Sequence, residues 1–193
     1  MRVHAGEQRP RRRRAPPAAT AHAWQKAAAG PAAFFIDMEL AKRLERQAVE
    51  AAGEGSETMA LLRGDVFASP SGGPTYAAAF ESASAPLRAS ATHVQFDREQ
   101  MDELAKALDD AAFDYLTVGW FHTHLGIGAR PSATDESTQA RFFSLEHQVA
   151  LIFDPVRKEA AAFRLVGGAL AATPVGVFDS REDGGEPWRR PKS

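Results

Sequence analysis

The sequence predicts a single domain of the mixed α/β class, in which helices flank a mixed, mostly antiparallel sheet. The chain has 193 residues and 44% of them are apolar, which is enough for one domain with a buried core. Strand-like and helix-like patterns alternate along its middle. They do so without the regular βαβ repeat of a parallel, doubly wound sheet, so a mixed sheet is the expected architecture.

The ends of the chain differ in composition from its middle. Residues 1–30 are rich in Arg, Pro and Ala with little apolar periodicity, which predicts a disordered leader. The first 14 residues hold six arginines and one glutamate, a charge of +5, which leaves −7 on the remainder. The arginine run could also contact an acidic partner. We therefore expect a domain at residues 31–180 and a loose tail at residues 181–193.

The first predicted elements are a strand at residues 34–36 and a helix that follows it. Asp37 is a suitable N-cap, and Leu40, Leu44 and Ala48 recur at helical spacing. The GEGS segment ends this helix. The stretch ETMALLRGDVF then predicts a strand, or a last helical turn that runs into one.

The middle of the chain predicts a turn at SPSGGP, a strand at TYAAAFES and a third strand at THVQF. A helix follows from Asp97, because Gln100 lies three residues later in a capping-box pattern. Met101, Leu104 and Leu108 give this helix its apolar stripe.

The last third begins with YLTVGWFHTH, an apolar run rich in strand-forming residues. A helix is expected from about Ser132 to Glu146. The strand QVALIFDP ends at Pro155 and pairs as a hairpin with EAAAFRLV. A last short strand is expected in PVGVFD.

Composition excludes several classes of protein. The chain has no cysteine, so disulfides, thiolate zinc sites and a cysteine nucleophile are all excluded. It contains no apolar run of the roughly 18 to 20 residues that span a bilayer. The arginine run is followed by no continuous apolar segment of a signal peptide, so we expect a cytoplasmic protein without membrane contact. The acidic middle of the chain argues against nucleic-acid binding by the domain.

The segment GWFHTHLGIGARPSATD carries the clearest chemistry. Side chains alternate along a strand, so His122 and His124 face the same way with Cα atoms about 6.6 Å apart. Val118 and Trp120 share that face and would form an apolar floor. The glycines that follow let the chain fold back, which returns Asp135 as an oxygen ligand in the first turn of a helix.

Two histidines and one carboxylate suit a zinc ion. Three protein ligands leave the fourth tetrahedral position for water, which is typical of a catalytic zinc, one per chain. Bound zinc lowers the pKa of water to about 7 and so makes hydroxide available at neutral pH. Taken alone, His122 and His124 could be two partly buried histidines, and Ser132 with Asp135 could be a helix cap. The combined spacing favours the metal site, and the cap is compatible with it.

These residues resemble the JAMM/MPN metalloprotease motif, in which His-x-His is followed at this spacing by Ser-x-x-Asp. ETMALLRG is similar to the upstream segment of that family, and LIFDP to the strand after its motif helix. The resemblance extends over about residues 34–166. It implies that His122, His124 and Asp135 bind zinc, that Glu57 is the general acid/base, and that Ser132 supports the oxyanion.

Two positions depart from the family pattern. Leu125 stands where a proline usually follows the second histidine, which leaves the rigidity of the next loop in question. Ala60 stands where a glycine is expected before the Leu-Leu pair. Neither change removes a ligand. For the general base, the nearby Glu54 is an alternative to Glu57.

The resemblance implies a zinc-dependent hydrolase that cleaves peptide or isopeptide bonds. The expected substrate is the Gly-Gly tail of a ubiquitin-like or sulfur-carrier β-grasp protein, held as an added strand. A regulatory partner or a homodimer is compatible with it.

Three other functions were weighed. The first is a non-catalytic MPN scaffold or interaction module, which the intact ligand set argues against. The second is a zinc nucleobase deaminase, whose usual form needs Pro-Cys-x-x-Cys and is excluded by the lack of cysteine. The third is nucleic-acid binding through the arginine-rich leader.

Overall fold

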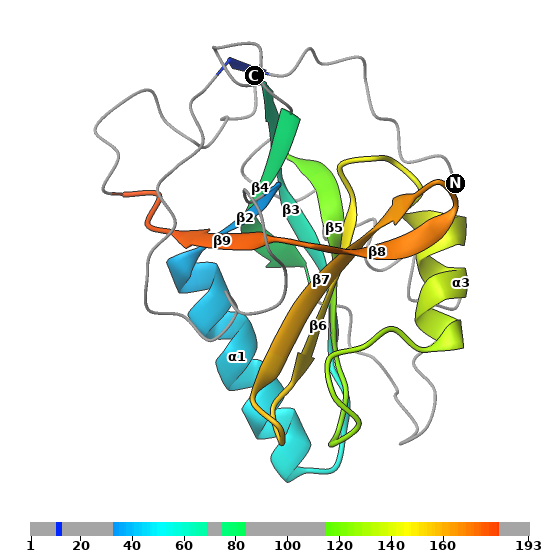
Figure 1. Cartoon of the computed structure of the whole chain (residues 1–193). Coiled ribbons are helices and arrows are strands. Elements are labelled where there is room, and N and C mark those ends of the chain that lie inside the picture. Colours follow the sequence, from blue (N-terminus) through cyan, green and yellow to red (C-terminus); the bar gives the residue numbers. More distant parts are fainter. Residues whose placement is uncertain (1–10, 13–32, 69–74, 84–114, 182–193) are drawn as a thin grey trace.

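The structure, a computed structural model, describes residues 11–12, 33–68, 75–83 and 115–181 (Figure 1). The turn expected at SPSGGP, the strand at THVQF and the helix from Asp97 lie outside these residues. Most of the predicted leader and tail lie outside them too, so the domain boundaries stay predictions. Neither described helix has the length and apolar composition needed to cross a bilayer.

The described residues form one nine-stranded sheet and two helices, which confirms the mixed α/β class. The helices are α1 (Met38–Gly53) and α3 (Ala133–Phe142). The strands are β1 (Arg11–Arg12), β2 (Phe34–Asp37), β3 (Met59–Ala68), β4 (Thr75–Ala83), β5 (Leu116–Thr123), β6 (Val149–Asp154), β7 (Glu159–Val166), β8 (Ala169–Thr173) and β9 (Val175–Phe178).

The sheet curls until its two ends nearly meet. Its order is β8-β7-β6-β5-β3-β4-β2-β9, with β1 beside β3. The ladders of β3 with β4 and β5, and of β7 with β6 and β8, are antiparallel, whereas β5–β6, β2–β4 and β2–β9 are parallel. Only Pro174 separates β8 from β9, the two outermost strands of this order. Figure 1 shows these two strands following each other across the view.

Helix α1 packs inside this curl. Asp37 caps it as predicted, because its carboxylate accepts the backbone N–H groups of Glu39 at 3.0 Å and Leu40 at 3.3 Å. The apolar stripe of the helix is fully buried in a core cluster that takes residues from β2, β3, β4, β5, β6, β7 and β9. Helix α3 lies on the other side of β5 and β6 (Figure 1).

A bulge in β5 changes which side chains face the predicted metal site. Leu62 pairs with Gly119 and Arg63 pairs with Thr117, so Val118 has no partner on β3. The extra residue interrupts the alternation of faces along β5. Val118 therefore lies in the main core with Phe121, while Trp120 alone lies beneath His122. The prediction that Val118 and Trp120 share the floor was wrong for Val118.

The helix after the motif is shorter than predicted. It ends at Phe142 rather than near Glu146, with Phe143 as its C-cap. The amide of Gln139 donates to the carbonyls of Phe143 and Gln148, and Gln148 accepts the N–H of Leu145. These side-chain hydrogen bonds replace the helical ones and turn the chain toward β6.

Two strands were not predicted. Strand β8 pairs antiparallel with β7 after a turn in which Gly167 and Gly168 both have positive φ angles. Its alanine-rich sequence lacks the β-branched and aromatic residues that mark a strand. Strand β1, within the predicted leader, pairs in parallel with the end of β3.

Gly119 tests how closely β5 approaches β6. A β-carbon at this position would overlap the backbone of Val149 on the neighbouring strand β6. We expect Gly119→Ala to lower the free energy of unfolding by about 1–3 kcal/mol, because the strand must shift to make room. Gly53→Ala is the matched control, since a β-carbon there meets open space at the end of α1. Urea unfolding of both variants measures the difference, and equal stability would contradict the close approach of β5 to β6 at this position.

Candidate metal centre

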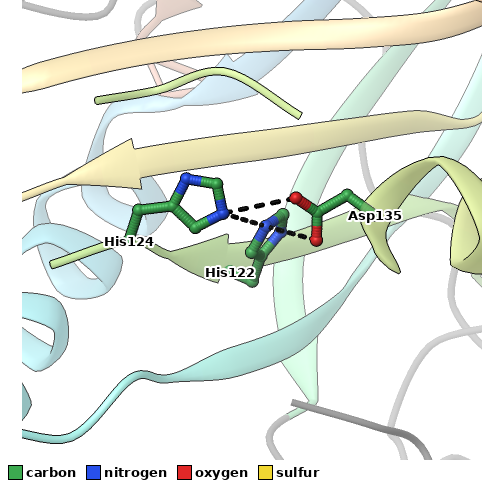
Figure 2. A group of neighbouring side chains, drawn as sticks. All are labelled: His122, His124 and Asp135. Atoms are coloured by element: carbon green, nitrogen blue, oxygen red, sulfur yellow. Dashed lines mark hydrogen bonds and ion pairs between the residues drawn. The ribbon is translucent and has the colours of Figure 1, made fainter. Parts of the chain in front are cut away.

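Three side chains from two neighbouring elements converge at the end of β5. His122 lies in the strand, His124 follows its last residue, and Asp135 lies in the first turn of α3. Their candidate ligand atoms all lie within 4.8 Å of one another, and all three residues are buried. Figure 2 shows the side chains directed toward one another, with Asp135 reaching in from the helix.

The distances place the carboxylate between the two rings. Nε2 of His122 lies 3.0 Å from Oδ1 of Asp135, and Nε2 of His124 lies 3.3 Å from Oδ2. The two Nε2 atoms are 3.2 Å apart. Both histidines therefore present the same ring nitrogen to one point, which is the arrangement that a shared metal ion needs.

His124 is held by one hydrogen bond of its ring and one of its backbone. Its Nδ1 lies 2.9 Å from the carbonyl oxygen of Gly128, and its backbone N–H donates to Phe153 at 3.0 Å. A carbonyl only accepts, so Nδ1 carries the proton of this hydrogen bond. In the neutral ring, Nε2 is then left with a lone pair for a metal.

The ring of His122 is held by stacking instead. It lies 4.3 Å from the Trp120 ring, measured between centroids, at an interplanar angle of 9°. The indole N–H of Trp120 donates to Gln139 at 2.7 Å, and Phe143 stacks on its far face. Among the described residues, Nδ1 of His122 has no hydrogen-bond partner. Packing therefore sets the orientation of this ring.

Ser132 and Asp135 form a reciprocal capping box at the start of α3. The Ser132 N–H donates to Oδ2 of Asp135 at 2.6 Å, and the Asp135 N–H donates to the Ser132 hydroxyl at 3.2 Å. One carboxylate therefore caps the helix and faces both histidines. The two interpretations of this sequence, helix cap and ligand, are compatible in the structure.

Glu57 lies just before β3, close enough to the cluster to interact with its charges. Thr58 and Thr123 join the two strands beside it through hydrogen bonds of 2.8 and 3.0 Å. Partial burial raises the pKa of Glu57, His124 opposes this effect, and Asp135 adds to it. Glu57 and the exposed Glu54 both line a pocket of about 350 Å³ between α1 and the start of β3.

The charges of the cluster are strongly coupled. Burial raises the pKa of Asp135, but its hydrogen bonds to both histidines outweigh this and hold that pKa far below its usual range. Burial also lowers the pKa of His122. For His124, burial lowers the pKa, but hydrogen bonds to Asp135 and Gly128 leave it raised. An ionised carboxylate between two imidazoles is a ligand set that attracts a divalent cation.

The donor set fits Zn²⁺. Two imidazole nitrogens and one carboxylate oxygen are borderline and hard donors that zinc accepts in tetrahedral sites with one open position. The unpartnered Nδ1 of buried His122 leaves its tautomer free, so its Nε2 can also offer a lone pair. His122, His124 and Asp135 are the residues that would hold the ion.

Three groups in this site were not assigned from the sequence. Gln139 lies one helical turn after Asp135, which is the only sequence signal for its contact with Trp120. The Gly128 carbonyl gives no signal, because every residue has one. Asp154 belongs to the family-like LIFDP segment, but no role follows from that segment alone.

The curated proteins that this chain resembles include the RPN11 proteins of three fungi. The 26S proteasome regulatory subunit RPN11 of Candida glabrata and the ubiquitin carboxyl-terminal hydrolase RPN11 of Saccharomyces cerevisiae are each 31% identical over 137 residues. The 26S proteasome regulatory subunit RPN11 of Eremothecium gossypii is 29% identical over 124 residues. The first two matches cover 62% of this chain but only 40% of the relative, so the chain spans about two fifths of their length.

A solved structure has a similar fold. The solution structure of protein DSY2949 from Desulfitobacterium hafniense matches with a TM-score of 0.54 over 78% of this chain and 97% of that one, at 17% identity. No family model matches the sequence. The similarity to the RPN11 proteins, over 62% of this chain, confirms the predicted resemblance to the JAMM/MPN family.

Metal content tests the cluster directly. We expect one zinc per chain in the purified protein, and far less in His122→Ala and in Asp135→Ala, because each variant loses one of three protein ligands. His147→Ala is the control, since this histidine lies outside the cluster and should leave the zinc content unchanged. Elemental analysis after removal of loosely bound metal measures the ratio. Full zinc content in both ligand variants would place the metal elsewhere.

Proposed function

We propose that the protein is a zinc-dependent hydrolase that cleaves peptide or isopeptide bonds. The observation that carries this proposal is the convergence of two imidazole nitrogens and a carboxylate beside a half-buried glutamate. A catalytic zinc site needs three such ligands and a general base within reach of the water. Glu57, which lines the pocket between α1 and the start of β3, is our candidate for that second role.

The proposed chemistry divides between the metal and the protein. When bound, zinc would supply a Lewis acid that makes water acidic near neutral pH and stabilises negative charge on oxygen. Glu57 accepts the proton that the attacking water loses and gives it to the departing amine nitrogen. The Ser132 hydroxyl accepts a hydrogen bond from Asp135, so its own proton is free to donate to the developing oxyanion.

The raised pKa of Glu57 suits this double role. A carboxylic acid with the usual pKa is a weak base and is almost fully ionised at neutral pH, so it returns a proton poorly. Burial disfavours the ionised form and brings the pKa of Glu57 closer to the working pH. Glu54 is exposed at the C-cap of α1, whereas Glu57 is half-buried, which is why we prefer Glu57 as the base.

We propose that the substrate is the Gly-Gly tail of a ubiquitin-like or sulfur-carrier β-grasp protein. The name of the S. cerevisiae relative, ubiquitin carboxyl-terminal hydrolase, supports this class. Both conjugate cleavage and precursor processing are compatible with one site of this kind. A regulatory partner or a homodimer, and a cytoplasmic location, remain part of the proposal.

A scaffold or interaction module is the alternative. Two of the relatives are named as regulatory subunits of the 26S proteasome, and a subunit can serve an assembly without catalysis. The ligand set supports the enzyme, because the helix cap accounts for the carboxylate but not for the two histidines that face it. Such a group is expensive to bury without a function that needs it.

Glu57→Gln separates the enzyme from the scaffold. The amide is nearly isosteric with the carboxylate, so fold and zinc content should stay close to wild type. Because glutamine cannot accept or return the proton, cleavage of a ubiquitin-like Gly-Gly conjugate should slow by about 10²- to 10⁴-fold. Single-turnover cleavage with zinc-loaded protein measures this rate.

Glu54→Gln is the matched control, because Glu54 lines the same pocket and should be dispensable. A wild-type rate in Glu57→Gln together with a slow Glu54→Gln would move the base to Glu54. No cleavage by the wild-type protein of any Gly-Gly conjugate would favour the scaffold.

A further inference from the structure

Asp154, the last residue of β6, ties two loops together beneath the metal site. Its side chain is fully buried, and Oδ2 accepts the N–H of Gly128 at 2.6 Å. Oδ1 accepts the N–H groups of Val156 and Arg157, each at 3.0 Å. The backbone N–H of Gly126 is a further donor. One carboxylate thus joins the loop after His124 to the turn between β6 and β7.

The loop that Asp154 holds cannot be kept in shape by its own backbone. Gly126 and Gly128 have φ angles of 85° and 91°, a region that glycine enters freely and also leaves freely. Leu125 stands at the position where the family usually has a rigid proline. The hydrogen bonds to Asp154 are therefore a local restraint on this loop. Burial raises the pKa of Asp154, but these N–H donors outweigh it and keep the carboxylate ionised.

The restrained loop carries the group that orients His124. Gly128 donates its N–H to Asp154 and presents its carbonyl oxygen to Nδ1 of His124, at 2.9 Å. A displacement of Gly128 would remove the acceptor that keeps the proton on Nδ1. Without it, the neutral ring could carry its proton on Nε2, the nitrogen that faces Asp135 and the metal position.

We propose that Asp154 is a positioning residue for the metal site, which acts through Gly128 to fix the tautomer and the orientation of His124. The inference rests on the zinc site of the proposed function and adds a residue that touches neither metal nor substrate. Groups that orient a metal-binding histidine typically contribute about 10- to 100-fold to metal affinity. Asp154 is placed to make a contribution of that size.

Asp154→Asn tests this role against a matched control. Asp37→Asn changes another buried carboxylate that accepts backbone N–H groups, from Glu39, Leu40 and Ser180, at the start of α1. Both variants should lower the melting temperature of the full chain measured in excess chelator. Only Asp154→Asn should weaken zinc affinity, by about 10- to 100-fold in competition with a chromogenic chelator. Equal zinc affinity in the two variants would overturn the proposal.

A second measurement decides the case if Asp154→Asn does not fold, or if the wild-type protein binds no zinc. Long-range ¹H–¹⁵N spectra of the metal-free wild-type chain at alkaline pH report the tautomer of each neutral histidine. We expect the proton of His124 on Nδ1, and a mixture of tautomers in Asp154→Asn where that variant folds. A proton on Nε2 of His124 in the wild-type chain would overturn the proposal. Failure of zinc binding alone would count against the proposed function and leave this result to stand.

Discussion

The structure depends on one buried carboxylate that satisfies three demands at once. Asp135 accepts the N–H of Ser132, the N-cap of α3, faces Nε2 of both histidines, and is almost completely removed from solvent. A buried charge is unfavourable unless hydrogen bonds and opposite charge surround it. The start of α3 and the end of β5 therefore have to lie next to each other. The loop between His124 and Ser132 has to bring them together within a few residues.

The sheet supplies the frame for that closure. Strands β5 and β6 are parallel neighbours, so their C-terminal ends lie together at one edge. His122 and His124 lie at the C-terminal end of β5, and Asp154 is the last residue of the neighbouring strand β6. Each histidine is then held by a different neighbour: His122 by the stacked Trp120, and His124 by the Gly128 carbonyl. Two separate supports fix two rings to one point, which is the preorganisation that a catalytic metal site needs.

Local pattern predicted most of the described elements and the convergence of His122, His124 and Asp135, because these depend on periodicity and spacing. The alternation of side chains along a strand predicted the wrong face for Val118. The bulge opposite Leu62 and Arg63 arises from the pairing of β5 with β3, which the sequence of β5 alone does not show. The predicted end of α3 was wrong because side-chain hydrogen bonds end the helix early. The Gln139 amide donates to the carbonyls of Phe143 and Gln148, and helical periodicity does not reveal these contacts. The role of the Gly128 carbonyl depends on backbone geometry, which residue identity does not encode.

The central claim is that His122, His124 and Asp135 hold one zinc ion, and crystal diffraction at the zinc absorption edge tests it most directly. Data collected on both sides of the edge locate zinc independently of the protein phases. The account predicts one anomalous peak per chain, about 2.0–2.2 Å from both Nε2 atoms and from an oxygen of Asp135. A peak at other residues, or none at this cluster in zinc-soaked crystals, would contradict it.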